Sequence, residues 1–520
     1  MSNHLIRTID GAVVNIVDDV LAHHDATSDR ALEILLQLRD RLGGITDDVL
    51  VRVADGLKLS RAELYELATF YPSVRYHPTA VATRAAACED LVCALVRSPH
   101  SAEEREATRD ESYLCGGSAC RGRCDSAQDV VGTGSNVVHA DKANWRTLES
   151  YRSAGGYGYV ERLRRGDVDA ADVLAAIERS GSASSVVRKW RAVRDQHGEP
   201  VVIANASEGE LGTFKDRHIL ERDPHGVIDA ALVAIAVVGA RRLIIYLRDD
   251  YDHLYRELQQ VINEMRVAGL GADVEFDLRR SGGAYICGEE TALIASLEGQ
   301  RGRPREQPPF PTTHGLFGRP TLVQNIETLY RLRAAWGMRV EASLPVTRLL
   351  DPAVRIFSVS GRVCCPGVQL MASLPNIAAL IAACGGMTEG EELGGVVLGG
   401  AAGSILTAEQ CRLPLDDLLR AGIRIGSGSS VIVFAQRDDV RWIAAKMAAF
   451  LARESCGQCT PCRVGTSKMA GMLAGGPLDP VLMRSLAEVM REASICGLGR
   501  SAGQFLAGAA ERLQGSAECR

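Results

Sequence analysis

The sequence predicts a multidomain α/β protein with a helical bundle at each end. Its 520 residues exceed what one hydrophobic core usually holds, and at roughly 150 residues per domain they predict three to four domains. From residue 200 onward, strand-like runs alternate with helical segments, which is the pattern of a largely parallel, layered sheet. Hydrophobic residues make up 46% and charged residues 24%, which is typical of folded soluble domains and not of disordered or coiled-coil chains.

The first 75 residues are expected to form a small helical bundle. Apolar residues recur there at helical spacing between charges, for example from Ala31 to Leu42, and this run ends at two glycines. Ser60 and Glu63 have the spacing of a capping box, which predicts a helix towards Phe70. Residues 76–145 are expected to form a second small domain, because short strand-like runs at 130–131 and 136–139 follow pairs of cysteines.

The central region, residues 146–345, is expected to be the layered α/β domain. Residues 201–204, 243–246 and 274–277 are predicted strands, and residues 226–239 and 251–267 are predicted helices. The glycines at 153–158 predict a linker. A smaller strand-rich domain is expected at 350–436, and a second helical bundle at 437–520.

Cysteine spacing near the C-terminus predicts a metal centre. The chain has 15 cysteines, and in a reducing compartment closely spaced sets are better explained as ligands than as disulfides. Cys456, Cys459 and Cys462 form a C-x2-C-x2-C pattern that suits a [4Fe–4S] cluster, and Cys496 is the expected fourth ligand. A zinc site from the same thiols is the alternative, although such sites usually present two separated pairs.

A second, looser set of cysteines lies nearer the N-terminus. Cys88 and Cys93 are spaced C-x4-C, and Cys120 and Cys124 are spaced C-x3-C. Two such pairs can hold a [2Fe–2S] cluster, with each pair binding one iron. Cys115 lies close enough to be an alternative ligand.

Two glycine-rich segments, residues 205–217 and 282–291, each follow a predicted strand. Glycines at such a position let the backbone approach a phosphate or a flat ring, and neighbouring carboxylates can accept hydrogen bonds from ribose hydroxyls. A tight structural turn explains the same glycines, so the residues alone leave both interpretations open.

Charge and hydropathy exclude other classes of protein. The net charge of −6 gives no broad basic surface for nucleic acid. The longest apolar run, residues 230–240, is far shorter than the ~20 residues that span a bilayer. Acidic residues interrupt the first 19 residues where a signal peptide needs an apolar stretch, so a cytoplasmic protein without a targeting signal is expected.

Longer strings of residues resemble a known family. The string Gly-Ala-Tyr285-Ile-Cys-Gly-Glu289-Glu290, the following Arg-Gly-x-Pro-Arg305 and Glu-Ser-Cys456-Gly-Gln-Cys459-Thr-Pro-Cys462-Arg resemble the flavin- and NADH-binding subunit of respiratory complex I. The N-terminal cysteine pairs, preceded by residues 65–71, resemble the neighbouring thioredoxin-like [2Fe–2S] subunit. The fused arrangement is similar to the diaphorase chains of NAD-reducing hydrogenases and, more closely, to the β-subunit of NAD-dependent molybdenum or tungsten formate dehydrogenases. Strings starting at Tyr151, Glu161, Glu221 and Ser358 favour the formate dehydrogenase branch.

The resemblance implies a fold, cofactors and partners. The implied parts are a thioredoxin-like [2Fe–2S] domain at 76–145, an FMN/NAD domain at 146–345, a β-grasp-like domain at 350–436 and a helical [4Fe–4S] domain at 437–520. NADH or NAD+ would exchange a hydride with FMN, and the clusters would carry single electrons to or from a catalytic α-subunit of the molybdenum or tungsten formate dehydrogenase type, with small accessory subunits as further candidates.

The resemblance also implies site residues. Glu289 and Glu290 take the catalytic positions of the family motif. The cofactor-binding positions are Lys189, Asn205, Glu208, Glu210, Tyr285, Glu289, Glu290, Phe310, Asn325 and Thr328.

The sequence departs from the family where the flavin phosphate is expected. The family's glycine-rich loop is replaced by a shorter segment from Ser180 to Lys189 that has almost none of its glycines. Ser207, Leu211, Gln307 and Gln324 also differ from the family, whereas all eight proposed cluster ligands are kept. Three hypotheses follow: an FMN-containing NAD-linked electron-transfer subunit, a flavin-free iron–sulfur relay, and a scaffold whose clusters only stabilise the fold.

Overall fold

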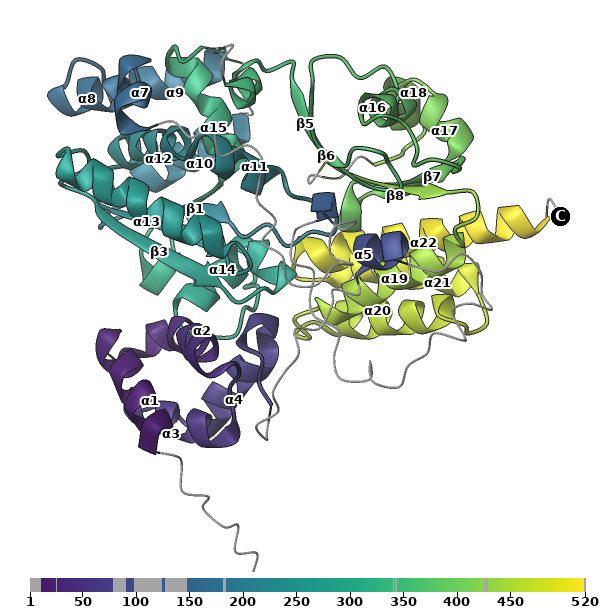
Figure 1. The fold of residues 1–520 in the computed structure, drawn as a ribbon, viewed down its shortest axis with the longest axis horizontal. Coiled ribbons are helices and arrows are strands. Elements are labelled where there is room, and N and C mark those ends of the chain that lie inside the picture. Colours follow the sequence, from purple (N-terminus) through teal and green to yellow (C-terminus); the bar gives the residue numbers. More distant parts are fainter. Residues whose placement is uncertain are drawn as a thin grey trace, which may run out of the picture.

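The computed structural model describes residues 11–24, 26–77, 90–97, 124–126, 147–180, 184–339, 341, 344–424, 426 and 429–518 (Figure 1). Most of the predicted domain at 76–145 lies outside the described residues. This includes both predicted strand-like runs there, together with Cys88, Cys115 and Cys120. Of that domain the structure describes helix α5 (Leu91–Arg97) with Cys93, and the short helix η4 (Cys124–Ser126).

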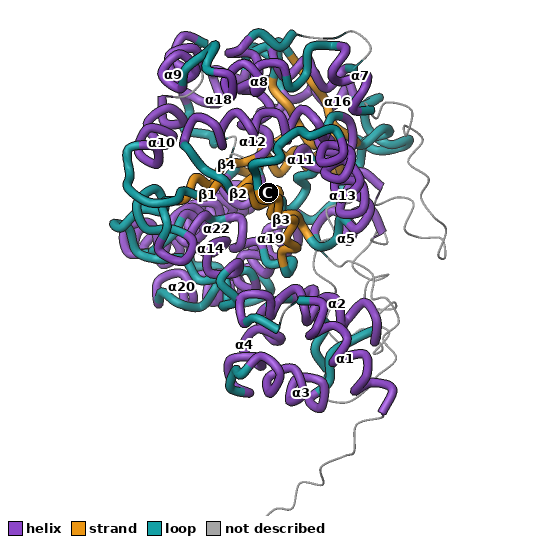
Figure 2. Tube along the Cα trace, turned by 90° about the vertical axis from the view of Figure 1, so that its left-hand side faces the viewer, coloured by secondary structure: helices purple, strands orange, loops and turns teal. Residues whose placement is uncertain are grey.

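The N-terminal region is a bundle of four helices, as predicted. The helices are α1 (Gly11–His23), α2 (Ala31–Leu42), α3 (Asp47–Leu57) and α4 (Arg61–Phe70). The predicted capping box is present, because the Ser60 hydroxyl accepts from the Glu63 N–H and the Glu63 carboxylate accepts from the Ser60 N–H. Figures 1 and 2 show that the four helices form a lobe below the rest of the molecule.

The central domain holds a parallel sheet in the order β3-β2-β1-β4. Its strands are β1 (Val201–Ala206), β2 (Arg242–Arg248), β3 (Glu275–Ser281) and β4 (Thr321–Asn325). The predicted helices are also present, as α12 (Pro224–Val238) and α13 (Asp252–Val267). The alternation of strands and helices therefore predicted this layer correctly.

The two faces of this sheet are covered by different parts of the chain. Val202, Leu243 and Leu322 belong to the core that includes α12 and α10 (Ser184–Arg194). The alternate residues Val201 and Ile244 belong to the core formed with α14 (Glu290–Leu297) and the N-terminal bundle. Because successive strand residues point to opposite faces, both faces are buried.

The predicted linker at 153–158 is wrong. It is a tight turn between α7 (Leu148–Ser153) and α8 (Gly158–Arg165), and Tyr157 within it is buried at 1% exposure. The Tyr157 N–H and the Tyr151 hydroxyl both donate to Asp229 on α12. A Cβ on Gly156 would overlap the Tyr151 ring, so this glycine permits close packing inside the turn. Glycine content therefore suggested a flexible segment where the fold has a buried turn.

The strand-rich domain contains a mixed sheet in the order β6-β5-β9-β7-β8. Its strands are β5 (Arg355–Gly361), β6 (Gly367–Met371), β7 (Leu393–Leu398), β8 (Ser404–Thr407) and β9 (Ser430–Ala435). Helices α16 (Ile377–Ala383), α17 (Ala408–Arg412) and α18 (Leu415–Arg420) accompany it.

The C-terminal region is a bundle of α19 (Val440–Arg453), α20 (Thr460–Leu473), α21 (Pro480–Ala493) and α22 (Gly497–Glu518), as predicted. Methionines 447, 469, 483 and 490 are buried in its core. Within the described part of the chain, every helix is too short or too polar to cross a membrane.

Candidate functional site

The carboxyl ends of β1 and β4 form the switch point of the parallel sheet. Chain order runs outward from β1 through β2 to β3 and then returns to place β4 on the other side of β1. Asn205 and Asn325 pair directly in the register of these two strands. Ligands of open α/β sheets bind in the crevice at such a point, so the structure brings these two predicted residues together where a nucleotide is expected.

Lys189 and Glu290 meet at the same edge. Lys189 comes from α10 and donates to the carbonyl of Val323 on β4 at 2.6 Å. Its ammonium also forms an ion pair with Glu290, the first residue of α14. The side chains are only 20% and 38% exposed, so a partly desolvated cation and carboxylate face each other beside the switch point.

The two asparagines hold loops at this edge. Asn205 Nδ2 donates to the carbonyl of Gly288 at 3.0 Å, which ties β1 to the second glycine-rich segment. Asn325 Nδ2 donates to Asp216 at 2.7 Å, and its Oδ1 accepts from the Glu327 N–H at the start of α15 (Ile326–Leu332). Both glycine-rich segments are therefore fixed to the strand ends.

Glu208 is buried and serves as a helix cap. Its two carboxylate oxygens accept from the N–H groups of Asp216 and Arg217 at 2.9 and 3.2 Å, at the start of α11 (Lys215–Arg222). The Tyr251 hydroxyl adds a third bond at 3.3 Å. Burial, together with the nearby Asp216 carboxylate, raises the pKa of Glu208 to about 7.

A buried charge cluster beside Glu208 was missed by the sequence reasoning. Lys215 lies between Asp216 and Glu327 at 2.7 and 2.9 Å, and it is only 8% exposed. The lysine lowers the pKa of Glu327. Lys215 and Asp216 lie at the end of the first glycine-rich segment, and Glu327 lies on α15. The adjacent charges at 215 and 216 were the only signal of this cluster in the sequence.

The remaining predicted cofactor residues lie at a helix cap, at a domain contact and on the surface. Glu289 caps α14 by accepting from the N–H groups of Thr291 and Ala292. Glu210 is buried and lies against Gly400 of the strand-rich domain. Phe310 is 51% exposed, so its ring is accessible, and Thr328 is half-buried on α15.

Tyr285 links the second glycine-rich segment to the C-terminal bundle. Its backbone N–H donates to the Glu454 carboxylate at 2.8 Å, and its ring lies 5.4 Å from that of Phe450 on α19. Burial raises the pKa of Glu454 above its ordinary value. Gly209 is essential to this packing, since a Cβ there would lie 2.8 Å from the Tyr285 Cα.

The four C-terminal cysteines surround one small cavity. Its lining includes all four predicted ligands together with Ile286, Pro304 and Leu498. Cys459 precedes α20, Cys462 lies in its first turn, and Cys496 precedes α22. The positive N-terminal ends of these helices favour thiolates and an anionic cluster.

The donor set fits a [4Fe–4S] cluster. Burial raises the pKa of Cys462 to about 12 and that of Cys496 to about 11, and a bound metal favours the thiolate form of its cysteine ligands. Across the residues that the structure describes, no three His, Cys, Asp or Glu side chains converge as a site for one metal ion. Four cysteines with this spacing that line one cavity are the ligand set of a [4Fe–4S] cluster.

Arg301 supports the cluster loop from outside. It donates to the Cys456 carbonyl at 2.6 Å, and its guanidinium lies 4.6 Å from the centre of the Phe70 ring. Arg301, which follows α14, therefore connects Phe70 of the N-terminal bundle to the cluster loop.

Cys93 and Cys124, the described members of the other cysteine set, belong to one core with α19 and the 211–214 loop. Asp125 pairs with Arg217, a side chain that is 2% exposed. Asp90 accepts from Arg453 at 2.7 Å. The first ion pair joins the 124–126 segment to the start of α11, and the second joins Asp90, just before α5, to the C-terminal bundle.

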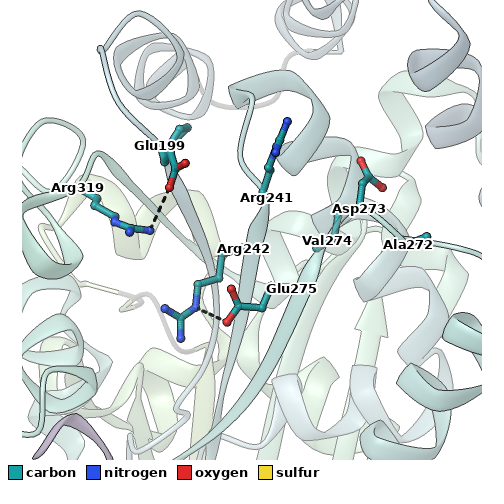
Figure 3. Close-up of a pocket in the computed structure, with 9 residues that line it drawn as sticks. Glu199, Arg241, Arg242, Ala272, Asp273, Val274, Glu275 and Arg319 are labelled. Carbon is teal, nitrogen blue, oxygen red and sulfur yellow. Dashed lines mark ion pairs between the residues drawn. The ribbon is translucent and has the colours of Figure 1, made fainter. Parts of the chain in front are cut away.

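A charged cleft of about 390 Å³ lies at the opposite, amino-terminal edge of the parallel sheet (Figure 3). Arg242 faces Glu275 at 3.4 Å, and Arg319 faces Glu199 at 3.7 Å. Because two of its three arginines, Arg242 and Arg319, are paired with carboxylates and it lies away from the switch point, this cleft is a poor nucleotide site.

Comparisons with known proteins agree with this arrangement. Family models match three stretches: the Nuo51 FMN-binding domain over residues 174–334, a thioredoxin-like [2Fe-2S] ferredoxin over 17–138, and the NADH-ubiquinone oxidoreductase-F iron-sulfur binding region over 442–518. The matches confirm the predicted fold class and the predicted cofactors FMN, [4Fe–4S] and [2Fe–2S], and NAD is consistent with them.

Curated relatives and a solved structure are similar over most of the chain. The F subunit of the NADH-quinone oxidoreductase from Aquifex aeolicus is 34% identical over 388 residues, covering 71% of this chain and 90% of that protein. The corresponding protein of Rhodobacter capsulatus is 35% identical, covering 74% and 88%. A chain of an NAD+-reducing [NiFe]-hydrogenase in the H2-reduced state superposes with a TM-score of 0.70 at 26% identity, covering 95% of this chain and 93% of that one.

Proposed function

We propose that this chain, which belongs to the family of the NADH-quinone oxidoreductase F subunits, transfers electrons between NAD(H), FMN and iron–sulfur clusters as the NAD-linked subunit of a formate dehydrogenase complex. Family membership supports the electron-transfer role. The formate dehydrogenase assignment goes further and rests on the sequence strings that resemble that branch. The domain boundaries at residues 75, 145, 345 and 436 belong to the same proposal.

One observation carries the electron-transfer role. Residues 285–290 form a short wall between the cysteine cavity and the switch point. Ile286 lines the cysteine cavity, the Gly288 carbonyl accepts from Asn205, and Glu290 pairs with Lys189. A flavin at the switch point would therefore be separated from the [4Fe–4S] cluster by this single segment, which suits transfer of single electrons.

The residues at the switch point fit the flavin phosphate despite the shortened loop. In the described part of the segment that replaced the glycine loop, residues 184–189 belong to α10, and Val186 and Val187 are buried. Lys189 places a partly buried positive charge at this edge, and a lysine ammonium there can bind a phosphate. When FMN binds, Lys189 would pair with its phosphate in place of Glu290.

The remaining roles are divided among the chain's own side chains. Bound FMN exchanges a hydride with nicotinamide and single electrons with clusters. Asn205 keeps the 282–291 segment against β1, and Glu208 orders α11 by capping its first N–H groups. Glu290, once released by Lys189, and the exposed ring of Phe310 would bind NAD(H), the ring by stacking on a flat base.

The cluster content tests this proposal first. Anaerobically purified protein should contain about one FMN and about six irons per chain, since a [2Fe–2S] and a [4Fe–4S] cluster together hold six. Cys496→Ser should lower iron to about two per chain and leave flavin unchanged. An iron content of about six per chain without flavin, even after incubation with FMN, would contradict the proposal and favour the flavin-free relay.

The nicotinamide site is tested by Glu290→Gln. This variant removes the carboxylate that pairs with Lys189, and it should reduce NADH-driven dye reduction at least 10-fold, a loss that corresponds to about 1.4 kcal/mol. Glu275→Gln is the matched control, because Glu275 lies in the cleft at the other edge of the sheet. Equal activities of the two variants would refute the assignment of Glu290.

The identity of the partner subunit is tested by asking which electron donor drives NAD+ reduction by the complex. The native complex that contains this chain should reduce NAD+ with formate and not with hydrogen. Hydrogen-driven reduction without formate activity would place the chain with the hydrogenase type and overturn the formate dehydrogenase assignment while leaving the electron-transfer role intact.

A further inference from the structure

We propose that Cys365 and Cys384, in the strand-rich domain, form a redox-active dithiol that closes to a disulfide by exchange with a small-molecule disulfide. Neither cysteine belongs to the cysteine cavity or to the switch point. Cys365 lies in the turn between β5 and β6, and Cys384 directly follows α16. The proposal is therefore independent of the function proposed above.

The backbone holds the two residues side by side. Val363 and Met387 form an antiparallel bridge, and the Cys364 N–H donates to the Gly386 carbonyl at 3.1 Å. The Cys365 N–H then donates to the Cys384 carbonyl at 2.9 Å. Standard bond lengths mean that one N–H···O bond of 2.9 Å keeps the Cα atoms of the two residues within about 6.5 Å, inside the range of about 4.4–6.8 Å that a disulfide spans.

The side chains select Cys365, and not Cys364, as the partner of Cys384. The Cys364 thiol donates to the Met387 carbonyl at 2.9 Å, which holds it in another direction. The Cys365 sulfur lies 3.5 Å from where a Cβ of residue 385 would stand, so it rests against the residue next to Cys384. Gly385, with φ +79°, leaves this approach open.

The two thiols have different roles in the exchange. Cys365 is exposed and can be reached by a small disulfide, whereas Cys384 is fully buried and burial raises its pKa to about 11. Cys365, as thiolate, attacks a disulfide RSSR, forms a mixed disulfide and releases one RS⁻. The Cys384 thiol then loses its proton, displaces the second RS⁻ and leaves the internal disulfide. Two protein thiols and one RSSR thus give one protein disulfide and two RSH.

The location gives the disulfide a structural consequence. It would tie the turn after β5 to the end of α16. Strand β5 also packs against α5 and η4, which carry Cys93 and Cys124. The turn that would carry the disulfide is thus joined by one strand to the described part of the [2Fe–2S] region.

The test uses the holoprotein, in which the cluster cysteines are occupied, treated with oxidised glutathione. Free thiols are then alkylated, and the digest is analysed by mass spectrometry. The expected product is a Cys365–Cys384 crosslinked peptide that is two hydrogens lighter than the reduced pair and disappears with dithiothreitol. Cys364→Ser should retain the crosslink and Cys365→Ser should abolish it, while Cys384→Ala should retain a stable glutathione adduct on Cys365.

Three results would overturn the proposal. These are alkylation of both cysteines after oxidation, a persistent glutathione adduct on wild-type Cys365, or a crosslink between Cys364 and Cys365. Cys365→Ser replaces an exposed residue, so loss of the crosslink in that variant cannot be ascribed to a failure to fold.

Discussion

Replacing Glu208 by glutamine should change how the stability of the central domain depends on pH. The wild-type carboxyl is 5% exposed, and burial beside Asp216 raises its pKa from the ordinary 4.5 to about 7. Between these two pH values the folded protein keeps a proton that the unfolded chain has released. Raising the pH through this window therefore lowers the free energy of unfolding.

The size of the effect follows from the pKa. Each pH unit between the unfolded and folded pKa values corresponds to about 1.4 kcal/mol, so Glu208 should lower the wild-type stability by about 3 kcal/mol between pH 4.5 and pH 8. Glutamine cannot ionise and removes this dependence. Its amide nitrogen cannot accept from the Arg217 N–H, which lowers stability by about 1 kcal/mol at every pH. The quantity that distinguishes the two proteins is thus the slope of the free energy of unfolding against pH.

Urea unfolding curves at several pH values, monitored by tryptophan fluorescence, measure this slope. Trp190 and Trp336, two of the four tryptophans, lie in the core of the central domain. Wild type should lose stability from pH 5 to pH 8 relative to Glu208→Gln. Glu199→Gln, which removes an exposed carboxylate at the other edge of the sheet, should follow wild type. Parallel slopes for wild type and Glu208→Gln would refute the reasoning.

Two further predictions concern packing around the site. Gly209→Ala would bring a Cβ to 2.8 Å from the Tyr285 backbone, so it should destabilise the chain by about 1–3 kcal/mol and weaken FMN binding in a flavin titration. Gly471→Ala, in α20, meets nothing within 4 Å and should bind flavin nearly as wild type does; the reverse order would contradict this packing. Arg217→Met removes the partner of Asp125 and should speed amide hydrogen exchange at 124–126 about 10-fold, equivalent to about 1.4 kcal/mol. Unchanged exchange would show that this ion pair does not anchor the segment.

Local patterns predicted most of the architecture because they report short-range physics. The alternation of strands and helices predicted the parallel layer, and Ser60 and Glu63 predicted a capped helix that the structure contains. The spacing of Cys456, Cys459 and Cys462 predicted thiols that the fold brings to one cavity with Cys496. The linker at 153–158 was wrong because glycine content cannot distinguish a flexible segment from a buried turn.

Sequence by itself determined the types of ligand and the order of the elements, since thiol spacing, turn glycines and hydrophobic period are local properties of the chain. Only the tertiary structure decided which partner each charged group has. Glu208 and Glu289 were expected beside cofactors, and the fold shows that both carboxylates cap helices. Pairs such as Asp125 with Arg217 join residues that are distant in sequence, and such a pair forms only when the fold brings the two groups close enough for their attraction to offset the cost of removing charge from water.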